Sequence, residues 1–304
     1  MKVLIAGGRG FLGSVLARQL RSSGHEVLVL TRRKTPSLGQ VYWDPARIGP
    51  WTDVLPHVDA VVNACGYGLE HWPWSAARKR LFLSSRVQPG QLLASAISAC
   101  NPRPKVFIQF SGVNRYGTSG DGVADETSPA GEDFLAQLTV QWEDATASLE
   151  SHGVRRVVVR NAIVLDASNG LFPLIVLPAR MFAGGRLGTG RQLIPWIHVE
   201  DHVRAILHLL ENQGCEGAYN LVAPQSTTNA EFMAAACAAL RRPYWLHMPE
   251  PALRVILGEM ATLVLEGRAS RPLRLVKSGF VFAHPTVDSA IHDLVGKPPQ
   301  ITES

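Results

Sequence analysis

The sequence predicts an α/β protein, with a doubly wound parallel sheet and a smaller lobe toward the C-terminus. Apolar runs rich in β-branched residues alternate with helix-patterned segments as far as about residue 210. Such alternation is typical of parallel strands that helices bury on both faces. Beyond it, Pro243, Pro249 and Pro251 break the chain into short pieces, which indicates a lobe of different construction.

The first element is a strand over residues 3–6 that leads into Gly7-x-x-Gly10-x-x-Gly13 and then into a helix. Such a loop aims the N–H groups and the positive dipole end of the helix at whatever lies above it, which suits a diphosphate. A lone glycine triplet is weak evidence, but here it stands between a strand and a helix. It predicts a Rossmann-type dinucleotide site; a plain strand–turn–helix is the alternative.

A second strand over residues 25–31 ends in Thr31 and is followed by Arg32-Arg33-Lys34. In dinucleotide folds an acidic residue at this place binds the free 2′-hydroxyl of the adenosine ribose, whereas cations accommodate a 2′-phosphate. Arginine forks onto phosphate oxygens. The absence of a carboxylate here favours NADP(H) over NAD(H), although a solvated basic turn accounts for at least one of the three charges.

Three further strands are expected at residues 59–66, 105–111 and 156–165, with helices at 75–99 and 133–151. Ligands of doubly wound sheets bind at the carboxyl ends of the strands. We therefore expect one crevice, lined by the residues at these ends: Gly7, Thr31, Ala64, Ser111 and Ala162.

The chain is expected to divide into two lobes and a tail. Residues 1–166 and 195–217 would form the NADP-binding domain, 167–194 and 218–296 a smaller substrate lobe, and 297–304 a frayed tail. Within the smaller lobe the sequence predicts a strand at 217–224, a helix that starts near Thr228, a helical run over 252–266 and a strand-like end at 279–285.

Composition excludes several classes of protein. The 304 residues carry a net charge of +5, and the cations are not gathered in one run with aromatics, so no nucleic-acid partner is expected. The longest apolar stretches fall short of the ~20 residues of a membrane helix, and no signal peptide is evident. We expect a cytoplasmic location and no membrane partner.

Cysteine usage predicts neither disulfides nor a metal site. Four cysteines are scattered without C-x-x-C spacing, which is typical of free thiols in a reducing compartment. They are Cys65, Cys100, Cys215 and Cys237. His198, Glu200 and Asp201 imitate metal-ligand spacing, but a strand-to-helix junction explains them better.

Ser111 and Tyr116, just beyond the strand at 105–111, are the candidate catalytic pair. A serine hydroxyl can hold a substrate oxygen, and a tyrosine hydroxyl can relay a proton. An unperturbed phenol titrates near pH 10, so Tyr116 would need a neighbouring cation. A loop tyrosine packed against the sheet is the equally weighted alternative.

Two other groups of residues could contact a substrate. Trp72 and Trp74 flank Pro73 after the third strand, and either wall a pocket or simply pack. Arg186 and Arg191 lie in a glycine-rich stretch without a P-loop lysine, which suits a substrate loop better than a nucleotide-triphosphate site.

Several stretches together give the chain a resemblance to the extended short-chain dehydrogenase/reductase superfamily. More narrowly it resembles the atypical epimerase-like subfamily often labelled nucleoside-diphosphate-sugar epimerase. The stretches run from residue 1 to about 295 and include residues 7–13, 79–87, 133–143, 184–192, 195–201, 219–232, 257–259 and 278–282.

The resemblance implies a Rossmann domain that binds NAD(P)(H), and a catalytic serine with a Tyr-x-x-x-Lys pair. This chain departs from that motif, because Leu135 and Thr139 stand where the tyrosine and the lysine would be. Cofactor contacts carry over more fully. The matching positions are Gly7, Gly10, Phe11, Leu12, Gly13, Thr31, Arg32, Arg33, Ala64, Cys65, Gly66 and Arg86, with Val164 near the nicotinamide.

The sequence therefore predicts an NADP(H)-dependent oxidoreductase or epimerase that acts on a hydroxyl or carbonyl carbon of a small molecule. A sugar or sugar nucleotide is a guess that follows from the family label. The missing tyrosine–lysine pair keeps a second hypothesis open, an NADP(H)-binding sensor or scaffold with little or no turnover. The helices at 75–99 and 133–151 allow a homodimer, because many relatives pair through such helices.

Overall fold

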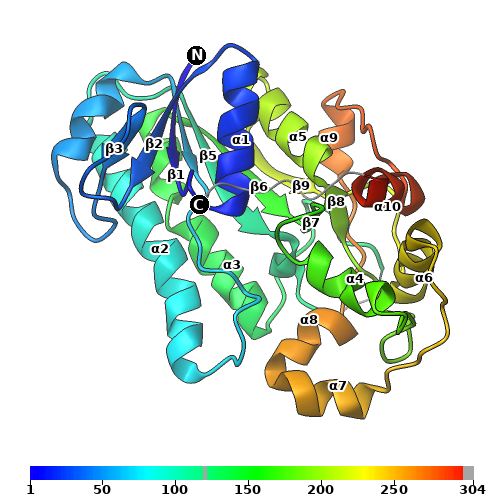
Figure 1. Ribbon diagram of the computed structural model, residues 1–304. Helices are drawn as coiled ribbons and strands as arrows, with labels where there is room; N and C mark the ends of the chain where they lie inside the picture. Colours follow the sequence, from blue (N-terminus) through cyan, green and yellow to red (C-terminus); the bar gives the residue numbers. More distant parts are fainter. Residues whose placement is uncertain (119–121, 297–304) are drawn as a thin grey trace.

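The computed structural model describes residues 1–118 and 122–296, and its centre is a seven-stranded parallel sheet (Figure 1). The strands lie in the order β3-β2-β1-β4-β5-β6-β9. Their bounds are β1 Lys2–Ala6, β2 Glu26–Thr31, β3 Gln40–Tyr42, β4 Ala60–Asn63, β5 Val106–Gly112, β6 Arg155–Asn161 and β9 Gly217–Leu221. The predicted fold class is confirmed.

Ten α-helices lie among the described residues, and Figure 1 shows α2 and α3 on one side of the sheet and α1 and α5 on the other. Their bounds are α1 Phe11–Ser22, α2 Ala76–Ala99, α3 Phe134–Asp144, α4 Phe172–Arg180, α5 Val199–Glu211, α6 Asn229–Leu240, α7 Glu250–Leu257, α8 Thr262–Leu265, α9 Leu273–Lys277 and α10 Val287–Gly296.

The period-two pattern of the first strand divides its side chains between two cores. Val3 and Ile5 join the core on the α1 and α5 side, whereas Leu4 and Ala6 join the core on the α2 side. Both faces of the strand are thus buried, as parallel sheets require. This burial fixes the register of β1 against β2 and β4, and so the place of the loop that follows Ala6.

A third core lies between α4, α6 and α10, away from the main sheet. It includes Phe172, Phe232 and Ile291, together with Trp196 from a second, two-stranded parallel sheet. The strands of that sheet are β7 Ile163–Leu165 and β8 Trp196–His198. A smaller lobe would need a separate core of this kind. The predicted bounds of the two lobes stay a prediction. The predicted tail, residues 297–304, lies outside the described residues.

Several elements differ from the expectation. The helical run predicted over 252–266 is interrupted at Gly258, which has φ +56, and becomes α7, a 3-10 turn and α8. Residues 279–285 form no strand. The elements β3, α4, α9 and α10 were not predicted from the sequence. The predicted helix start near Thr228 is confirmed, and Thr228 forms a capping box with Glu231.

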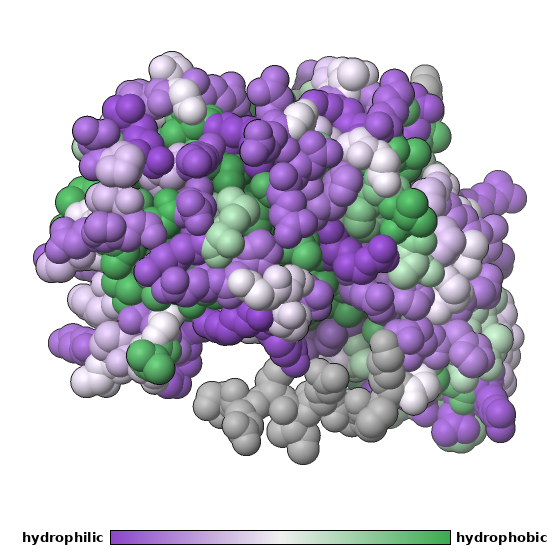
Figure 2. Space-filling model, turned by 90° about the horizontal axis from the view of Figure 1, so that it is seen from above, coloured by the Kyte–Doolittle hydropathy of each residue, from purple (hydrophilic) through white to green (hydrophobic). Residues whose placement is uncertain are grey.

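Polar residues predominate on the face shown in Figure 2, where hydrophobic residues lie in small patches between them. Within the described residues, none of the helices is both long and apolar enough to cross a membrane.

Candidate functional site

The glycine loop after β1 is built so tightly that side chains would not fit. A Cβ atom on Gly7, whose φ is +81, would lie 2.6 Å from the backbone carbon and oxygen of Ala64. A Cβ on Gly13 would lie 2.3 Å from the carbonyl oxygen of Gly7. The loop therefore presses against the end of β4 while α1 starts directly above it.

Helix α1 begins at this loop without a side-chain cap. Gly10 is its N-cap residue, and its own N–H donates to the Gly7 oxygen at 2.9 Å. The first N–H groups of a helix carry partial positive charge and need acceptors from outside the helix. An uncapped N-terminus beside a glycine cradle is the arrangement that binds a diphosphate.

Beyond β2 the backbone turns outward and carries cations. Thr31 is buried, and its hydroxyl oxygen accepts the N–H of Arg33 at 3.2 Å. Arg32 and Arg33 are exposed. Because β1 and β2 pair in register, Ala6 against Leu30, this turn lies next to the glycine loop.

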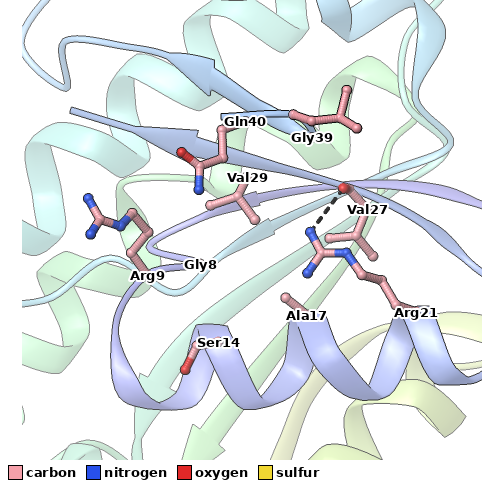
Figure 3. Close-up of a pocket in the computed structure, with 10 residues that line it drawn as sticks. Gly8, Arg9, Ser14, Ala17, Arg21, Val27, Val29, Gly39 and Gln40 are labelled. Atoms are coloured by element: carbon pink, nitrogen blue, oxygen red, sulfur yellow. Dashed lines mark hydrogen bonds between the residues drawn. The ribbon is translucent and has the colours of Figure 1, made fainter. Parts of the chain in front are cut away.

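A groove of about 450 Å³ opens on the same side, between α1 and the β2–β3 edge of the sheet (Figure 3). The side chains of Arg9 and Gln40 point toward one another across it, and Arg21 at the other end donates to the Val27 oxygen. Arg9 belongs to the glycine loop itself, so a cation reaches the site from β1 as well as from β2.

The end of β4 brings the next predicted residues together. The side-chain oxygen of buried Asn63 accepts the N–H of Cys65 at 3.2 Å and so fixes the chain as it leaves the strand. Burial raises the pKa of the Cys65 thiol to about 12, opposed by the charge of Arg32. This thiol is neutral near pH 7.

Arg86, from α2, lies against Gly66. A Cβ on Gly66 would lie 3.2 Å from its guanidinium carbon. Its Nη1 donates to the carbonyl oxygens of Tyr67 and Phe82, whereas its buried Nε has no hydrogen-bond partner within the described residues. Burial lowers the pKa of Arg86 to about 10, opposed by Glu70. A buried cation with a spare donor is ready for an acceptor supplied from outside.

Phe11, Leu12 and Val164 pack on the α1 side of the sheet. A Cβ on Gly170 would lie 2.9 Å from the Phe11 ring and 3.7 Å from the Val164 oxygen. The structure thus brings the first turn of α1 and the end of β7 together, as expected for residues that share one ligand.

Ser111 and Tyr116 belong to a buried network around Glu143. Ser111 Oγ donates to Glu143 Oε1 at 2.7 Å, and Arg160 clasps both carboxylate oxygens through Nε at 2.8 Å and Nη2 at 3.0 Å. Arg115 Nη1 lies 3.3 Å from Glu143 Oε2. This end of the sheet is held by a desolvated ion pair with a second arginine beside it.

Tyr116 extends the network to β9. Its hydroxyl accepts from Arg160 Nη1 at 2.9 Å and donates to Asn220 Oδ1 at 2.6 Å, while Asn220 Nδ2 donates to the Arg271 oxygen. Burial raises the pKa of Tyr116 and outweighs the opposing charge and hydrogen bond of Arg160. A cation does reach the phenol, but it does not activate it.

As folded here, neither candidate catalytic hydroxyl faces solvent. Tyr116 is 0% exposed and Ser111 is 2% exposed, and both have already donated their protons within the protein. Thr139, at the place of the usual lysine, is also buried and donates back to the Leu135 oxygen of its own helix. The catalytic role of Ser111 and Tyr116 stays a prediction that requires this end of the sheet to open.

Residues 250–266 cross the carboxyl edge of the sheet; we call them the crossing segment. Trp72 Nε1 donates to the Leu257 oxygen at 3.1 Å, and Lys79 Nζ lies 2.5 Å from Glu259 Oε2. Further along, Glu266 accepts from Thr118 Oγ1 at 3.0 Å. The loop after β4 and the loop after β5 are thus both tied to the crossing segment.

Trp74 and Trp72 have different surroundings. Trp74 packs edge-on against Phe82 and Phe134, with ring centroids 5.6 and 6.1 Å apart. Trp72 is 54% exposed. Packing therefore accounts for Trp74, whereas Trp72 holds the crossing segment.

His198, His284 and Asp293 bring possible metal-ligand atoms within 4.8 Å of one another. However, the N–H of Glu200 donates to His198 Nδ1 at 3.2 Å, so the ring proton sits on Nε2. That Nε2 faces Asp293 Oδ2 at 3.2 Å, and a protonated nitrogen offers no lone pair to a metal.

Asp201, from the same stretch, is fully buried and acts as an anchor. Its carboxylate accepts the N–H groups of Ala283 and His284 at 2.7 and 2.8 Å. It holds the loop before α10 against the start of α5. This agrees with the prediction that residues 198–201 form a strand-to-helix junction and not a metal site.

Three polar residues of the site were not found from the sequence. Arg9 stands inside the glycine motif, so its position at the mouth of the groove could have been inferred. Glu143 and Asn220 gave no local signal, because their partners lie 32 and 104 residues away.

Comparisons with known proteins agree with this geometry. A model of the NAD dependent epimerase/dehydratase family matches residues 3–221, and a model of a domain of unknown function, DUF1731, matches residues 248–294. The epimerase family protein ML0860 of Mycobacterium leprae is 39% identical over 300 residues, which cover 98% of this chain and 97% of that protein.

Two solved structures are similar along nearly the whole chain. Human epimerase family protein SDR39U1 (isoform 2), solved with NADPH, is 34% identical with a TM-score of 0.89, covering 97% of this chain and 99% of that one. A nucleoside-diphosphate sugar epimerase from Corynebacterium glutamicum is 28% identical with a TM-score of 0.81, covering 97% and 58%. On the family model and these relatives, the chain belongs to the NAD dependent epimerase/dehydratase family.

Proposed function

We propose that this protein binds NADP(H) and is an NADP(H)-dependent oxidoreductase or epimerase. The observation that carries the choice of cofactor is the set of cations beside the glycine loop. Arg9, Arg32 and Arg33 stand at neighbouring strand ends, and residues 32–34 include no carboxylate that could bind a free 2′-hydroxyl. The human relative solved with NADPH supports the same choice.

The residues present fit such a cofactor. Gly7 and Gly13 leave a cradle that a Cβ would fill, and the N-terminus of α1 has no side-chain cap. Arg86 keeps a buried Nε without a hydrogen-bond partner in the described chain. We assign the diphosphate to the start of α1, the 2′-phosphate to Arg9, Arg32 and Arg33, and the adenosine side to residues 64–66.

When bound, the nicotinamide would give or take a hydride. The chain must then orient a substrate oxygen and move its proton. Ser111 and Tyr116 are the proposed groups for these tasks, and Val164 the proposed neighbour of the nicotinamide. For them to act, Ser111 must exchange Glu143 for the substrate and Tyr116 must exchange Asn220.

The proposed substrate is a small molecule with a hydroxyl or carbonyl carbon. A sugar or sugar nucleotide is one candidate, supported by the sugar epimerase among the similar structures. Arg186 and Arg191 are exposed on the smaller lobe and are proposed to meet an anionic part of it.

The direct test is a fluorescence titration of the purified protein with NADPH and with NADH. We expect saturable binding of both, with NADPH at least about tenfold tighter, since one charged hydrogen bond is worth about 1.5–3 kcal/mol. Equal affinities would remove the 2′-phosphate assignment. Binding of neither would contradict the cofactor proposal as a whole.

One observation favours a second function, a cofactor sensor or scaffold with little turnover. Both candidate hydroxyls are buried and have donated their protons to Glu143 and Asn220, so neither can donate to a substrate carbonyl as the chain is folded here. A screen of NADPH oxidation over carbonyl substrates, sugar nucleotides included, separates the two. Turnover that Tyr116→Phe abolishes supports the enzyme; tight NADPH binding without turnover supports the sensor.

A further inference from the structure

One surface of the smaller lobe combines exposed apolar side chains with arginines, and we call it the basic–aromatic patch. It comprises the outer face of α4, the turn after it, and the segment between α6 and α7, which lie close together in Figure 1. Its apolar members are Leu174, Leu177, Met181, Phe182, Tyr244 and Trp245, which are 57, 46, 68, 55, 42 and 68% exposed.

Helix α4 presents this apolar surface because it is hydrophobic on both faces. Phe172, Val176 and Ala179 are fully buried in the third core. Residues 174, 177 and 181 repeat at steps of three and four on the opposite face and remain in solvent. A helix that is apolar all round is usually buried all round, so its outer face lacks the covering that its composition calls for.

The charges of the patch have one sign. Arg180, Arg241 and Arg242 are exposed within it. Residues 167–199 and 232–249, which supply the whole patch, contain no aspartate or glutamate. An anionic ligand surface would therefore meet several cations and no repelling carboxylate from these stretches.

The backbone is strained at two points, and both lie in the patch. Phe182 has φ +63 and Arg241 has φ +54, the non-glycine residues of the described chain with positive φ. For a bulky aromatic residue this conformation is an outlier, and glycine or asparagine would adopt it at lower cost. Both residues stand at the C-terminal end of a helix, Phe182 after α4 and Arg241 after α6, where a left-handed residue commonly ends the helix.

Local contacts join Phe182 to the segment between α6 and α7. Arg242 stacks on the Phe182 ring at 4.1 Å, and Trp245 Nε1 donates to the Phe182 oxygen at 2.8 Å. Trp245 N also donates to the Gly184 oxygen at 2.9 Å, which joins the two segments. The aromatic and cationic groups are thus presented as one unit.

We propose that the basic–aromatic patch binds peripherally to the surface of an anionic lipid membrane. Side chains that project from the surface, with tryptophan, tyrosine and phenylalanine among them and arginines around them, suit insertion at the headgroup level. Each arginine near an anionic surface strengthens binding by about fivefold. Binding of this kind needs no membrane-spanning helix, and the described residues contain none.

Other occupants fit less well. Two copies of the chain meeting through this patch would bring arginines against arginines. Single-stranded nucleic acid would use the aromatic rings and the cations, but it would leave the aliphatic face of α4 exposed. An acidic protein surface remains as an outcome of the test.

The experiment is cosedimentation with phosphatidylcholine vesicles, with and without 30% phosphatidylglycerol, at low salt. We expect at least tenfold stronger binding to the anionic vesicles, weakened by salt. Phe182→Gly and Arg241→Asn each suit a positive φ, so their melting temperatures should stay the same or rise while binding falls by about fivefold. Ile48→Ser, which changes an exposed apolar residue elsewhere, is the control and should bind normally.

Two results would overturn the proposal: no binding to anionic vesicles, and binding that Phe182→Gly and Arg241→Asn leave unchanged. If the vesicles bind no protein, a patch-dependent dimer in sedimentation velocity would assign the patch to a second copy of the chain. A monomer that ignores vesicles would point to an acidic protein surface instead. The cofactor titration is independent of all of these outcomes.

Discussion

At the ends of β1, β2 and β4 the chain presents a helix N-terminus and exposed arginines, whereas at the ends of β5, β6 and β9 its polar side chains bind one another away from water. Gly7 and Arg32 represent the first end. Glu143, Arg160 and Tyr116 represent the second. Both ends lie on one edge of one sheet, so the difference lies in the side chains and not in the fold.

The first end is ready for a ligand, because α1 begins there without a side-chain cap and the side chains of Arg32 and Arg33 are exposed. The second end is satisfied without one. Burial alone would lower the pKa of Arg160, but the hydrogen bonds and the charge of Glu143 outweigh it and raise the pKa of Arg160. One edge of the sheet thus combines an open end, to which we assign the cofactor, with an end proposed as catalytic that its own residues close.

The largest loss of stability is expected when the Glu143 network at the closed end is disrupted. Glu143→Ala leaves Arg160 buried and uncompensated, which should lower the free energy of unfolding by about 3–5 kcal/mol. Glu26→Ala removes the exposed partner of Lys2 in a surface ion pair and should cost about 0–1 kcal/mol. Denaturant unfolding of the two variants measures the contrast; equal losses would mean that the Glu143 network contributes no more than a surface pair.

Substitutions at the open end should change the affinity for the cofactor and leave the free energy of unfolding nearly unchanged. Arg32→Ala is expected to weaken NADPH by about 10–100-fold, which corresponds to one charged hydrogen bond, and to leave NADH unchanged. Arg9→Ala should show the same selectivity. Arg103→Ala, a change at an exposed arginine just before β5 and so at the opposite edge of the sheet, serves as the control in the same fluorescence titration. Equal weakening of both cofactors would refute the role given to Arg32.

Tyr116→Phe tests whether the closed end ever works on a substrate. Removing the hydroxyl leaves Arg160 Nη1 and Asn220 Oδ1 without this partner, so unfolding should become easier by about 1–2 kcal/mol. NADPH affinity should not change. If a substrate is found, turnover should disappear with the hydroxyl, and normal turnover would exclude Tyr116 from catalysis.

The smallest effect at neutral pH concerns His202, which is fully buried beside Asn161 at the end of β6. Burial lowers its pKa to about 3, against about 6.5 in an unfolded chain. The unfolded state therefore binds the proton first, and stability falls as the pH drops from about 6.5 toward 3, by up to about 1.4 kcal/mol per pH unit.

His202→Gln should remove that part of the slope, and His152→Gln, at an exposed histidine, should not. Denaturant unfolding at several pH values measures both. An unchanged slope in His202→Gln would show that His202 does not titrate in this window.

The fold was predictable where a local pattern determines it. Period-two burial and the glycine loop gave β1, α1 and β2 with their order, and the kinship with extended short-chain dehydrogenases/reductases is confirmed. Strand β3 has three residues at the sheet edge, too few for a periodic signal. Helix α4 was missed because Pro173 and Pro178 suggest breaks, although both occur within it.

The candidate site divides in the same way. The glycine loop and the arginines that predict a phosphate site can be recognised from the sequence alone. Glycine acts there through its backbone and arginine through its charge, so neither depends on which other side chains pack nearby. The role of Glu143 depends on which side chains meet it from β5 and β6, and that was settled only by packing. The assignments of individual cofactor and catalytic residues stay predictions for the experiments above.

The crossing segment has a consequence for the order in which the protein is completed during synthesis. Residues 250–266 are translated after β9, the last strand of the sheet. A nascent chain can therefore hold a finished sheet and glycine loop while Trp72 and Lys79 still lack Leu257 and Glu259. For that interval the loop after β4 lacks the contacts that hold it in the finished protein, so its final position is set only when the last fifth of the chain has been made.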